Sequence, residues 1–139
     1  MTASSPASHS TAQSTLLVVD DEERMLKTFV LLLQANGFKV LSAAEGEEAM
    51  GIVQQSGDAI DAVITDVYMP RMDGIEFTRA FRALYPNKGV VVCSGALTSD
   101  HSKEFNALGG CVFLQKPFTM DELITRVKQA LAGIKTNVS

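Results

Sequence analysis

The chain alternates five times between a short apolar run and a stretch of helical periodicity. The apolar runs predict strands at 15–20, 38–42, 61–66, 89–94 and 111–115. Three of these runs are nearly continuous in Val, Ile and Leu, which is typical of strands whose two faces are both covered. Five β/α units of this length predict one parallel sheet with helices on both faces.

Apolar side chains recur on one face of each intervening stretch. The predicted helices are 23–36, 45–55, 74–84, 98–108 and 120–132. Asn36-Gly37 is a typical helix stop, and Thr119 with Glu122 forms a capping-box pattern. The stretch 98–108 has the weakest apolar stripe, so we expect this helix to be the most mobile.

The length and charge of the chain exclude several classes of protein. The chain has 139 residues, of which 46% are apolar, enough for one domain with a proper core and too few for two. A net charge of −4 argues against a general nucleic-acid binder and against a polybasic membrane surface. No apolar run approaches the roughly 20 residues of a membrane span. We therefore expect no direct binding of nucleic acid or membrane.

The ends of the chain and its cysteines indicate its organisation and compartment. Residues 1–14 are rich in Ser, Thr and Ala and lack a signal-peptide pattern, so they predict a disordered tail. We predict a folded domain at 15–133, and a tail or the start of a linker at 134–139. Cys93 and Cys111 each lie inside an apolar run, as core residues in a reducing compartment do. This usage predicts a cytoplasmic protein.

Polar and charged side chains stand where four of the predicted strands end. The first strand ends at Asp20-Asp21, and the third ends at Asp66. Ser94 ends the fourth strand, and Lys116 directly follows the fifth. Any one of them alone would be an ordinary turn or cap residue. Because ligands bind at the carboxyl ends of strands in such sheets, the five together predict a functional site.

The charges of these residues indicate the chemistry of the site. Three carboxylates a few ångström apart cannot all stay ionised without compensation, and Lys116 supplies only one positive charge. A divalent cation held by oxygen ligands supplies the rest, and Mg²⁺ fits a site with few carboxylates. Metal and lysine would together form a positively charged binding site for a phosphoryl group. One of the carboxylates can then act as nucleophile and become an aspartyl phosphate.

Four sequence elements, "VVDDE", "DVYMPRMDG", "CSGA" and "KPF", resemble in content and order the motifs of the receiver domain of bacterial two-component response regulators. The resemblance covers residues 14–133, essentially the whole predicted domain. It implies a flavodoxin-like α/β fold, a doubly wound five-stranded parallel sheet in the order 2-1-3-4-5 with five helices. Each element alone is weak, but their combination is specific.

The resemblance also implies a role for each phosphoryl-binding residue. Asp66 would be the phosphoacceptor, and Ser94 and Lys116 would bind oxygens of the phosphoryl group. Ser94 and Phe113 would be the switch residues, Phe113 turning inward when Ser94 moves. The peptide bond between Lys116 and Pro117 corresponds to one that is cis in the family.

The resemblance gives the implied metal ligands as well. Asp21 and Asp66 would bind Mg²⁺, or another divalent cation, directly, and Asp20 would bind it through water. The backbone carbonyl of Tyr68 would be a further ligand. Glu22-Glu23 is expected to begin the first helix, where negative charge is favourable.

A response regulator of this kind is a phosphorylation-driven switch. A sensor histidine kinase would donate a phosphoryl group to Asp66, and its charge of roughly −2 would draw Ser94 and Lys116 inward. The face formed by 98–108, 111–115 and 120–132 would then repack and control an output partner or domain. The chain would catalyse only its own phosphorylation and dephosphorylation. The output is left open, as is a phosphorylation-dependent homodimer.

Two other classes with related chemistry or fold are disfavoured by single residues. A phosphatase of the haloacid dehalogenase kind needs a second Asp two residues after the nucleophile, where this chain has Tyr68. A flavodoxin needs a Ser/Thr-rich phosphate loop after the first strand, where acids stand here. A receiver-like binding module without phosphorylation would have lost Asp66 or Lys116, and both are present.

The sequence departs from the family pattern at three places. Tyr68 is bulky at a position that affects phosphoryl lifetime in the family, so we predict that it shields the phosphoryl group from water. Phe113 replaces the commoner Tyr and would signal by packing alone. Gly109-Gly110 replaces the commoner Gly-Ala and predicts a looser approach to the following strand. Gly74, by contrast, fits the helix start of the family.

Overall fold

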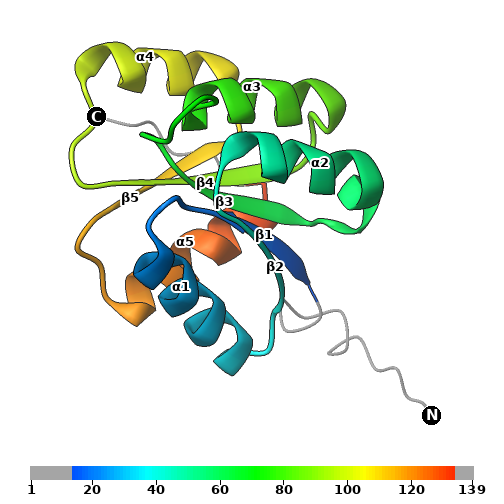
Figure 1. Cartoon of the computed structure of the whole chain (residues 1–139). Helices are drawn as coiled ribbons and strands as arrows, with labels where there is room; N and C mark the ends of the chain where they lie inside the picture. The colour runs from blue at the N-terminus through cyan, green and yellow to red at the C-terminus, as the bar shows by residue number, and fades with distance from the viewer. Residues whose placement is uncertain (1–13, 134–139) are drawn as a thin grey trace.

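A five-stranded parallel sheet lies between two layers of helices in the computed structural model, which describes residues 14–133 (Figure 1). The strands are β1 (Thr15–Val19), β2 (Lys39–Ala43), β3 (Ala62–Asp66), β4 (Gly89–Ser94) and β5 (Cys111–Gln115). The helices are α1 (Glu23–Ala35), α2 (Gly46–Ser56), α3 (Gly74–Leu84), α4 (Ser99–Leu108) and α5 (Met120–Leu131). The strand order β2-β1-β3-β4-β5 confirms the predicted fold.

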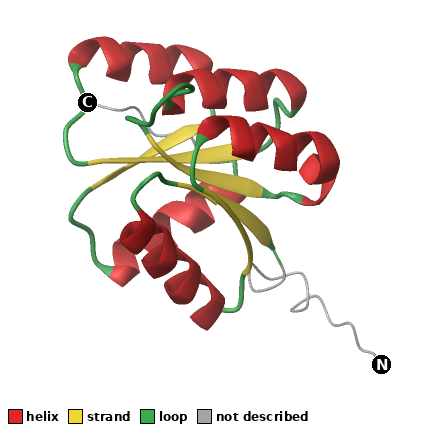
Figure 2. Ribbon diagram, viewed as in Figure 1, coloured by secondary structure: helices red, strands yellow, loops and turns green. Residues whose placement is uncertain are grey.

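The helices divide between the two faces of the sheet. Helices α1 and α5 cover one face, and α2, α3 and α4 cover the other (Figures 1 and 2). Every predicted strand and helix is present, with ends that differ by at most one residue, and a short 3-10 helix, η3 (Gly57–Ala59), was not predicted. The predicted tails lie outside the described residues, apart from Ser14. None of the helices within 14–133 combines the length and apolarity needed to cross a membrane.

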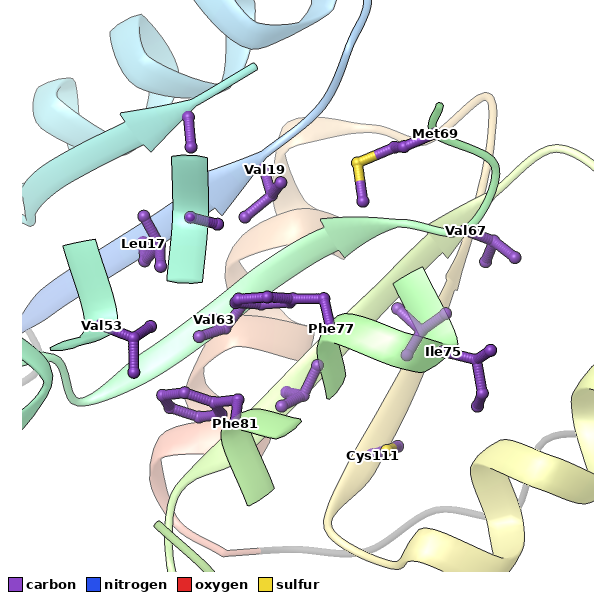
Figure 3. Close-up of a cluster of buried hydrophobic side chains, with 14 of the residues drawn as sticks. Leu17, Val19, Val53, Val63, Val67, Met69, Ile75, Phe77, Phe81 and Cys111 are labelled. Atoms are coloured by element: carbon purple, nitrogen blue, oxygen red, sulfur yellow. The ribbon is translucent and has the colours of Figure 1, made fainter. Parts of the chain in front are cut away.

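The continuous apolar run of β1 fills both faces of the sheet. Leu17 and Val19 belong to the cluster under α2, α3 and α4, part of which Figure 3 shows. Leu16 and Val18 belong to a second cluster with α1 and α5. All four side chains are at most 1% exposed, because successive residues of a strand point to opposite faces and helices cover both.

Side-chain caps set where the helices begin. The capping box predicted for Thr119 and Glu122 is present at the start of α5, and a second box joins Asp73 and Glu76 at the start of α3. Glu22 is the N-cap residue of α1, which confirms that the acids after Asp21 begin this helix.

Helix α4 buries one apolar side chain, fewer than any other α-helix of the described residues. Thr98 is its N-cap residue, and its hydroxyl accepts a hydrogen bond from the backbone N–H of His101. The buried residues of α4 are only Ser102 and Phe105, whereas α3 buries five residues. A helix with few buried apolar contacts moves more easily than one that is packed on the core. The mobility of α4 therefore remains a prediction, and its small number of buried residues is the physical reason for it.

The Gly109-Gly110 pair leads into β5 with positive φ at both residues, 71° and 70°. An added Cβ at Gly110 would lie 2.4 Å from the guanidinium carbon of Arg82. That guanidinium also donates a hydrogen bond of 2.7 Å to the carbonyl of Lys88. Glycine at 110 therefore makes room for an arginine from α3 that packs against this turn.

Candidate functional site

Three carboxylates meet at the carboxyl edge of the sheet, as predicted. Asp20 directly follows β1, and Asp66 is the last residue of β3, the neighbouring strand. One carboxylate oxygen from each of Asp20, Asp21 and Asp66 lies within 4.8 Å of the others. Asp20 is buried, Asp66 is half-buried and Asp21 is exposed. The group therefore opens to solvent on the side of Asp21.

Asp20 is the most firmly fixed of the three acids. Its Oδ1 accepts a hydrogen bond of 2.9 Å from the backbone N–H of Glu22, and its own N–H donates to the carbonyl of Ala43 at 3.2 Å. Its Oδ2 lies 3.4 Å from Nζ of Lys116. Both oxygens of Asp20 thus have protein partners.

Lys116 places its ammonium group between two of the acids. Its Nζ lies 3.4 Å from Asp20 Oδ2 and 3.8 Å from Asp66 Oδ1. Its side chain is 19% exposed, so these interactions are only partly screened by water. The backbone N–H of Lys116 donates to the carbonyl of Ser94 at 2.9 Å, and the Lys116–Pro117 bond is cis, as the resemblance implied.

Asp66 presents its carboxylate on a fixed backbone. Its Oδ1 accepts a hydrogen bond of 2.8 Å from the backbone N–H of Val67. Gly74, the first residue of α3, donates its N–H to the carbonyl of Val67 at 2.7 Å. The start of α3 therefore packs directly against the chain that carries the carboxylate.

The electrostatics show that one lysine does not balance the acids. Burial raises the pKa of Asp20 and of Asp66 above the ordinary value of 3.8, and the attraction of Lys116 opposes the rise without cancelling it. Burial alone would lower the pKa of Lys116, but the neighbouring Asp20 and Asp66 outweigh it and the pKa rises. The site consequently favours further positive charge.

Ser94 stands at the same edge, but its hydroxyl is directed into the following turn. Its Oγ donates to the carbonyl of Ala96 at 3.0 Å and accepts from the N–H of Ala96 at 3.3 Å. The residue is buried, with 2% exposure. Ser94 would have to leave this turn to bind a group on Asp66.

The predicted switch aromatic, Phe113, is half-buried. Its side chain packs against the core cluster under α2, α3 and α4. Its carbonyl accepts a hydrogen bond of 3.1 Å from Nε of Arg126 in α5. The residue thus connects β5 with α5, and both elements belong to the face that the sequence predicted to change.

Tyr68, two residues after Asp66, has contacts that the sequence did not predict. Its hydroxyl lies 3.3 Å from Nδ1 of His101 in α4, and the two rings meet edge to face with centroids 5.3 Å apart. The side chain of Tyr68 is among the exposed large residues, at 48%. No short-range pattern could have linked these positions, because 33 residues separate them.

Both cysteines are free and buried, which confirms their prediction as core residues. Burial raises the pKa of the Cys93 thiol to about 12 and that of Cys111 to about 11. Such thiols stay protonated at neutral pH and are poor nucleophiles and metal ligands.

The family of the chain follows from comparison with known proteins. The family model for the response regulator receiver domain matches residues 16–128. The chain belongs to this family. The receiver domain therefore belongs to two-component systems, and this membership favours a receiver over the phosphatase and flavodoxin alternatives.

Curated relatives carry the same domain within longer chains. Sensor kinase CckA of Brucella abortus is 36% identical over 118 residues, which are 85% of this chain and 12% of that protein. Response regulator MprA of Mycolicibacterium vanbaalenii is 32% identical over 116 residues, which are 84% of this chain and 49% of that protein. The chain thus spans half or less of the length of these relatives.

Solved structures match the fold closely. The chemotaxis protein CheY4 of Vibrio cholerae is 30% identical with a TM-score of 0.80, covering 86% of this chain and 99% of that one. A chain of the CheX–CheY–BeF3–Mg complex of Borrelia burgdorferi is 28% identical with a TM-score of 0.77, covering 84% of this chain and 87% of that one. Both likenesses support the doubly wound fold.

Proposed function

We propose that this receiver domain accepts a phosphoryl group on Asp66 from a phosphohistidine of a sensor kinase, and that it works as a signalling switch. The observation that carries the proposal is the cluster of three carboxylates within 4.8 Å, with Lys116 at 3.4 Å and 3.8 Å from two of them. A carboxylate oxygen of Asp66 attacks phosphorus as the bond from phosphorus to the histidine nitrogen breaks. The electron pair stays on the imidazole, which takes up a proton.

The donor set fits Mg²⁺, which prefers oxygen ligands and a few carboxylates. Asp21, Asp66 and the carbonyl of Tyr68 would hold the ion directly. Asp20 would act through water, because its oxygens already bind Lys116 and the N–H of Glu22. The ion would supply positive charge to the oxygens of the phosphoryl group. The presence of Mg and BeF3 in the Borrelia burgdorferi complex supports this assignment.

Lys116 and Ser94 are the residues that would bind the phosphoryl group. Lys116 already faces Asp66, so the new negative charge strengthens an existing interaction. Ser94 would exchange its hydrogen bond with Ala96 for one with a phosphoryl oxygen. Phosphorylation would thereby shift the turn that leads into α4 and repack the face of α4, β5 and α5 around Phe113. The domain acts only on its own Asp66, so we propose no metabolic substrate.

The domain is proposed to work in the cytoplasm and to pass its signal to a partner at this face. The two buried free thiols support a reducing compartment. The output partner, and a homodimer formed on phosphorylation, are expected to read the position of α4.

The proposal is tested by labelling. The native chain is incubated with Mg²⁺ and acetyl phosphate, and intact mass is expected to show one added phosphoryl group. Asp66→Ala and a sample with excess chelator are expected to stay unmodified. Equal labelling of Asp66→Ala, or no adduct on the native chain with either acetyl phosphate or beryllofluoride, would overturn the proposal.

The surface of α1 gives a prediction about the kinase. Leu31 is 67% exposed, and it borders a groove with an apolar floor that includes Leu26 and Val30. This helix begins directly beside Asp20 and Asp21. A kinase domain that brings its phosphohistidine to Asp66 would contact this face. Leu31→Ser is therefore expected to slow phosphotransfer from a cognate kinase about tenfold, the effect of losing one apolar contact residue.

A matched control separates docking from chemistry. Leu84 in α3 is a second exposed leucine, at 56%, on the other face of the sheet. Leu84→Ser is expected to leave phosphotransfer from the kinase unchanged, and neither substitution should alter labelling by acetyl phosphate. Equal loss of kinase phosphotransfer in both variants would contradict docking at α1.

The prediction that Tyr68 shields the phosphoryl group has its own measurement. Tyr68→Ala is expected to speed loss of the phosphoryl group about fivefold, because water reaches the aspartyl phosphate more easily. The loss is followed by intact mass after the donor is removed, with Tyr68→Phe as the variant that keeps the ring. An unchanged rate in Tyr68→Ala would refute shielding.

A further inference from the structure

The ring of Tyr68 links the phosphoacceptor loop to the first turn of α4. Tyr68 belongs to the loop between β3 and α3, two residues after Asp66. Its hydroxyl lies 3.3 Å from Nδ1 of His101, and the rings pack edge to face at 81°. Two independent contacts, a polar one and an aromatic one, therefore fix the tyrosine on the histidine.

His101 is itself held in place by the cap of the helix. Thr98 Oγ1 lies 2.9 Å from Nδ1 of His101 and accepts the backbone N–H of the same residue at 3.1 Å. Since the threonine oxygen accepts from the N–H, its own proton can be donated to Nδ1. The single lone pair of Nδ1 is then directed mainly to the nearer hydroxyl, that of Thr98 at 2.9 Å, and the hydroxyl of Tyr68 at 3.3 Å shares it only weakly. The histidine thus moves with the start of α4, and the tyrosine is its weaker partner.

Among the described residues, an ion pair also joins α3 to α4, and this pair is exposed to solvent. Arg79 and Glu104 lie 3.3 Å apart, with side chains 54% and 44% exposed. Exposed ion pairs contribute little to stability. The Tyr68–His101 contact, in contrast, joins α4 to the loop that follows the phosphoacceptor. The connection from Ser94 to α4 is also short, because only four residues, 95–98, lie between them.

We propose that His101 is a positioning residue for Tyr68, and that through it the position of α4 sets the lifetime of the phosphoryl group. The inference rests on the proposed function. When Ser94 leaves the carbonyl of Ala96 for the phosphoryl group, the short connection draws the start of α4 after it. His101 then carries the ring of Tyr68 towards the acceptor, where it excludes water.

The same contact gives a partner access to the phosphoryl lifetime. A partner that binds α4 and holds it in one position would change the rate at which the phosphoryl group is lost, because it would fix the distance of the Tyr68 ring from the acceptor. The Tyr68–His101 pair would in this way let the output partner prolong or shorten the signal. The regulated quantity is the lifetime of the aspartyl phosphate, with no change in which residue is modified.

A double-mutant cycle tests the coupling. The full chain is labelled with acetyl phosphate and Mg²⁺, and loss of the adduct is followed in His101→Ala, Tyr68→Ala and the double variant. His101→Ala is expected to speed the loss about threefold, less than Tyr68→Ala does, because the histidine acts only through the tyrosine ring. In the Tyr68→Ala background, His101→Ala is expected to add nothing. Effects that multiply in the double variant would overturn the proposal.

Two further variants exclude a general loosening of α4. His101→Asn retains a polar atom near the position of Nδ1 and is expected to restore part of the lifetime. Glu104→Ala removes the ion pair to Arg79 without touching Tyr68 and is expected to leave the lifetime unchanged. A lifetime shortened equally by Glu104→Ala and His101→Ala would refute a specific role of the histidine.

Tyrosine fluorescence gives a direct view of the contact. The chain has two tyrosines and no tryptophan, so in Tyr85→Phe the emission comes from Tyr68 alone. Beryllofluoride with Mg²⁺ is expected to change this emission, and the change should be lost when His101→Ala is added. If no adduct forms on the native chain, the proposed function itself fails. If an adduct forms but His101→Ala changes neither lifetime nor emission, only the positioning role is refuted.

Discussion

Asp66→Asn is expected to raise the free energy of unfolding of the metal-free receiver domain at neutral pH by on the order of 1 kcal/mol, while it abolishes phosphorylation. The raised pKa values of Asp20 and Asp66 mean that their ionised forms are less favourable in the fold than in the unfolded chain. Asparagine removes one of these charges and can still accept the hydrogen bond from the N–H of Val67. The native carboxylate is thus kept for function at a cost in stability.

The sign of the pH dependence follows from the same shifts. A carboxyl group with a raised pKa in the fold binds its proton more tightly there than in the unfolded chain. Its destabilising effect is full above the folded pKa and disappears as pH falls towards the ordinary value of 3.8. Lys116, whose pKa is raised, stays charged throughout this range. The stability gain of Asp66→Asn over the native chain should therefore shrink as pH falls.

Urea unfolding followed by circular dichroism, in chelator and at several pH values, measures this difference. Saturating Mg²⁺ is expected to reverse the order of stability, because an ion that binds only the folded state stabilises it by mass action. Asp66→Asn lacks one ligand charge and should gain less from the ion. If Asp66→Asn is the less stable protein at neutral pH in chelator, the electrostatic account of the site is wrong.

The sequence predicted the fold because each level of the pattern agreed. Apolar runs, capping boxes and the acids at strand ends all pointed to one parallel sheet covered by helices on both faces. The resemblance to receiver domains added the strand order, and the structure has that order. Asp20, Asp66 and Lys116 were predicted to meet because parallel strands bring their carboxyl ends to one edge. Their proximity follows from the parallel arrangement of the strands, which the alternation of strands and helices along the sequence predicts.

Contacts that depend on the orientation of a side chain, or on a hydrogen bond with the backbone, could not be predicted from the sequence pattern. The hydroxyl of Ser94 lies in the turn with Ala96, and Asp20 is fixed by the N–H of Glu22. The pairing of Tyr68 with His101 joins a loop to a helix that is distant in the sequence.

Gly74→Ala is expected to lower the free energy of unfolding by about 3 kcal/mol, the scale of a steric conflict in a packed site. A Cβ at this position would lie 2.1 Å from the carbonyl oxygen of Asp66 and 2.9 Å from Cα of Val67. Both atoms belong to the backbone that carries the phosphoacceptor, so neither can move aside without moving the site. Alanine favours a helix by only about 1 kcal/mol over glycine and cannot offset this conflict.

Gly51→Ala is the matched control, because an added Cβ there meets nothing within 4 Å. Gly51 lies inside α2, so this substitution is expected to raise stability by about 0.5 to 1 kcal/mol. In urea unfolding the two alanine variants should therefore shift in opposite directions. Gly74→Ala should in addition label more slowly with acetyl phosphate, since any relief of the conflict displaces Asp66. A Gly74→Ala protein that unfolds and labels like the native chain would show that α3 does not constrain the phosphoacceptor.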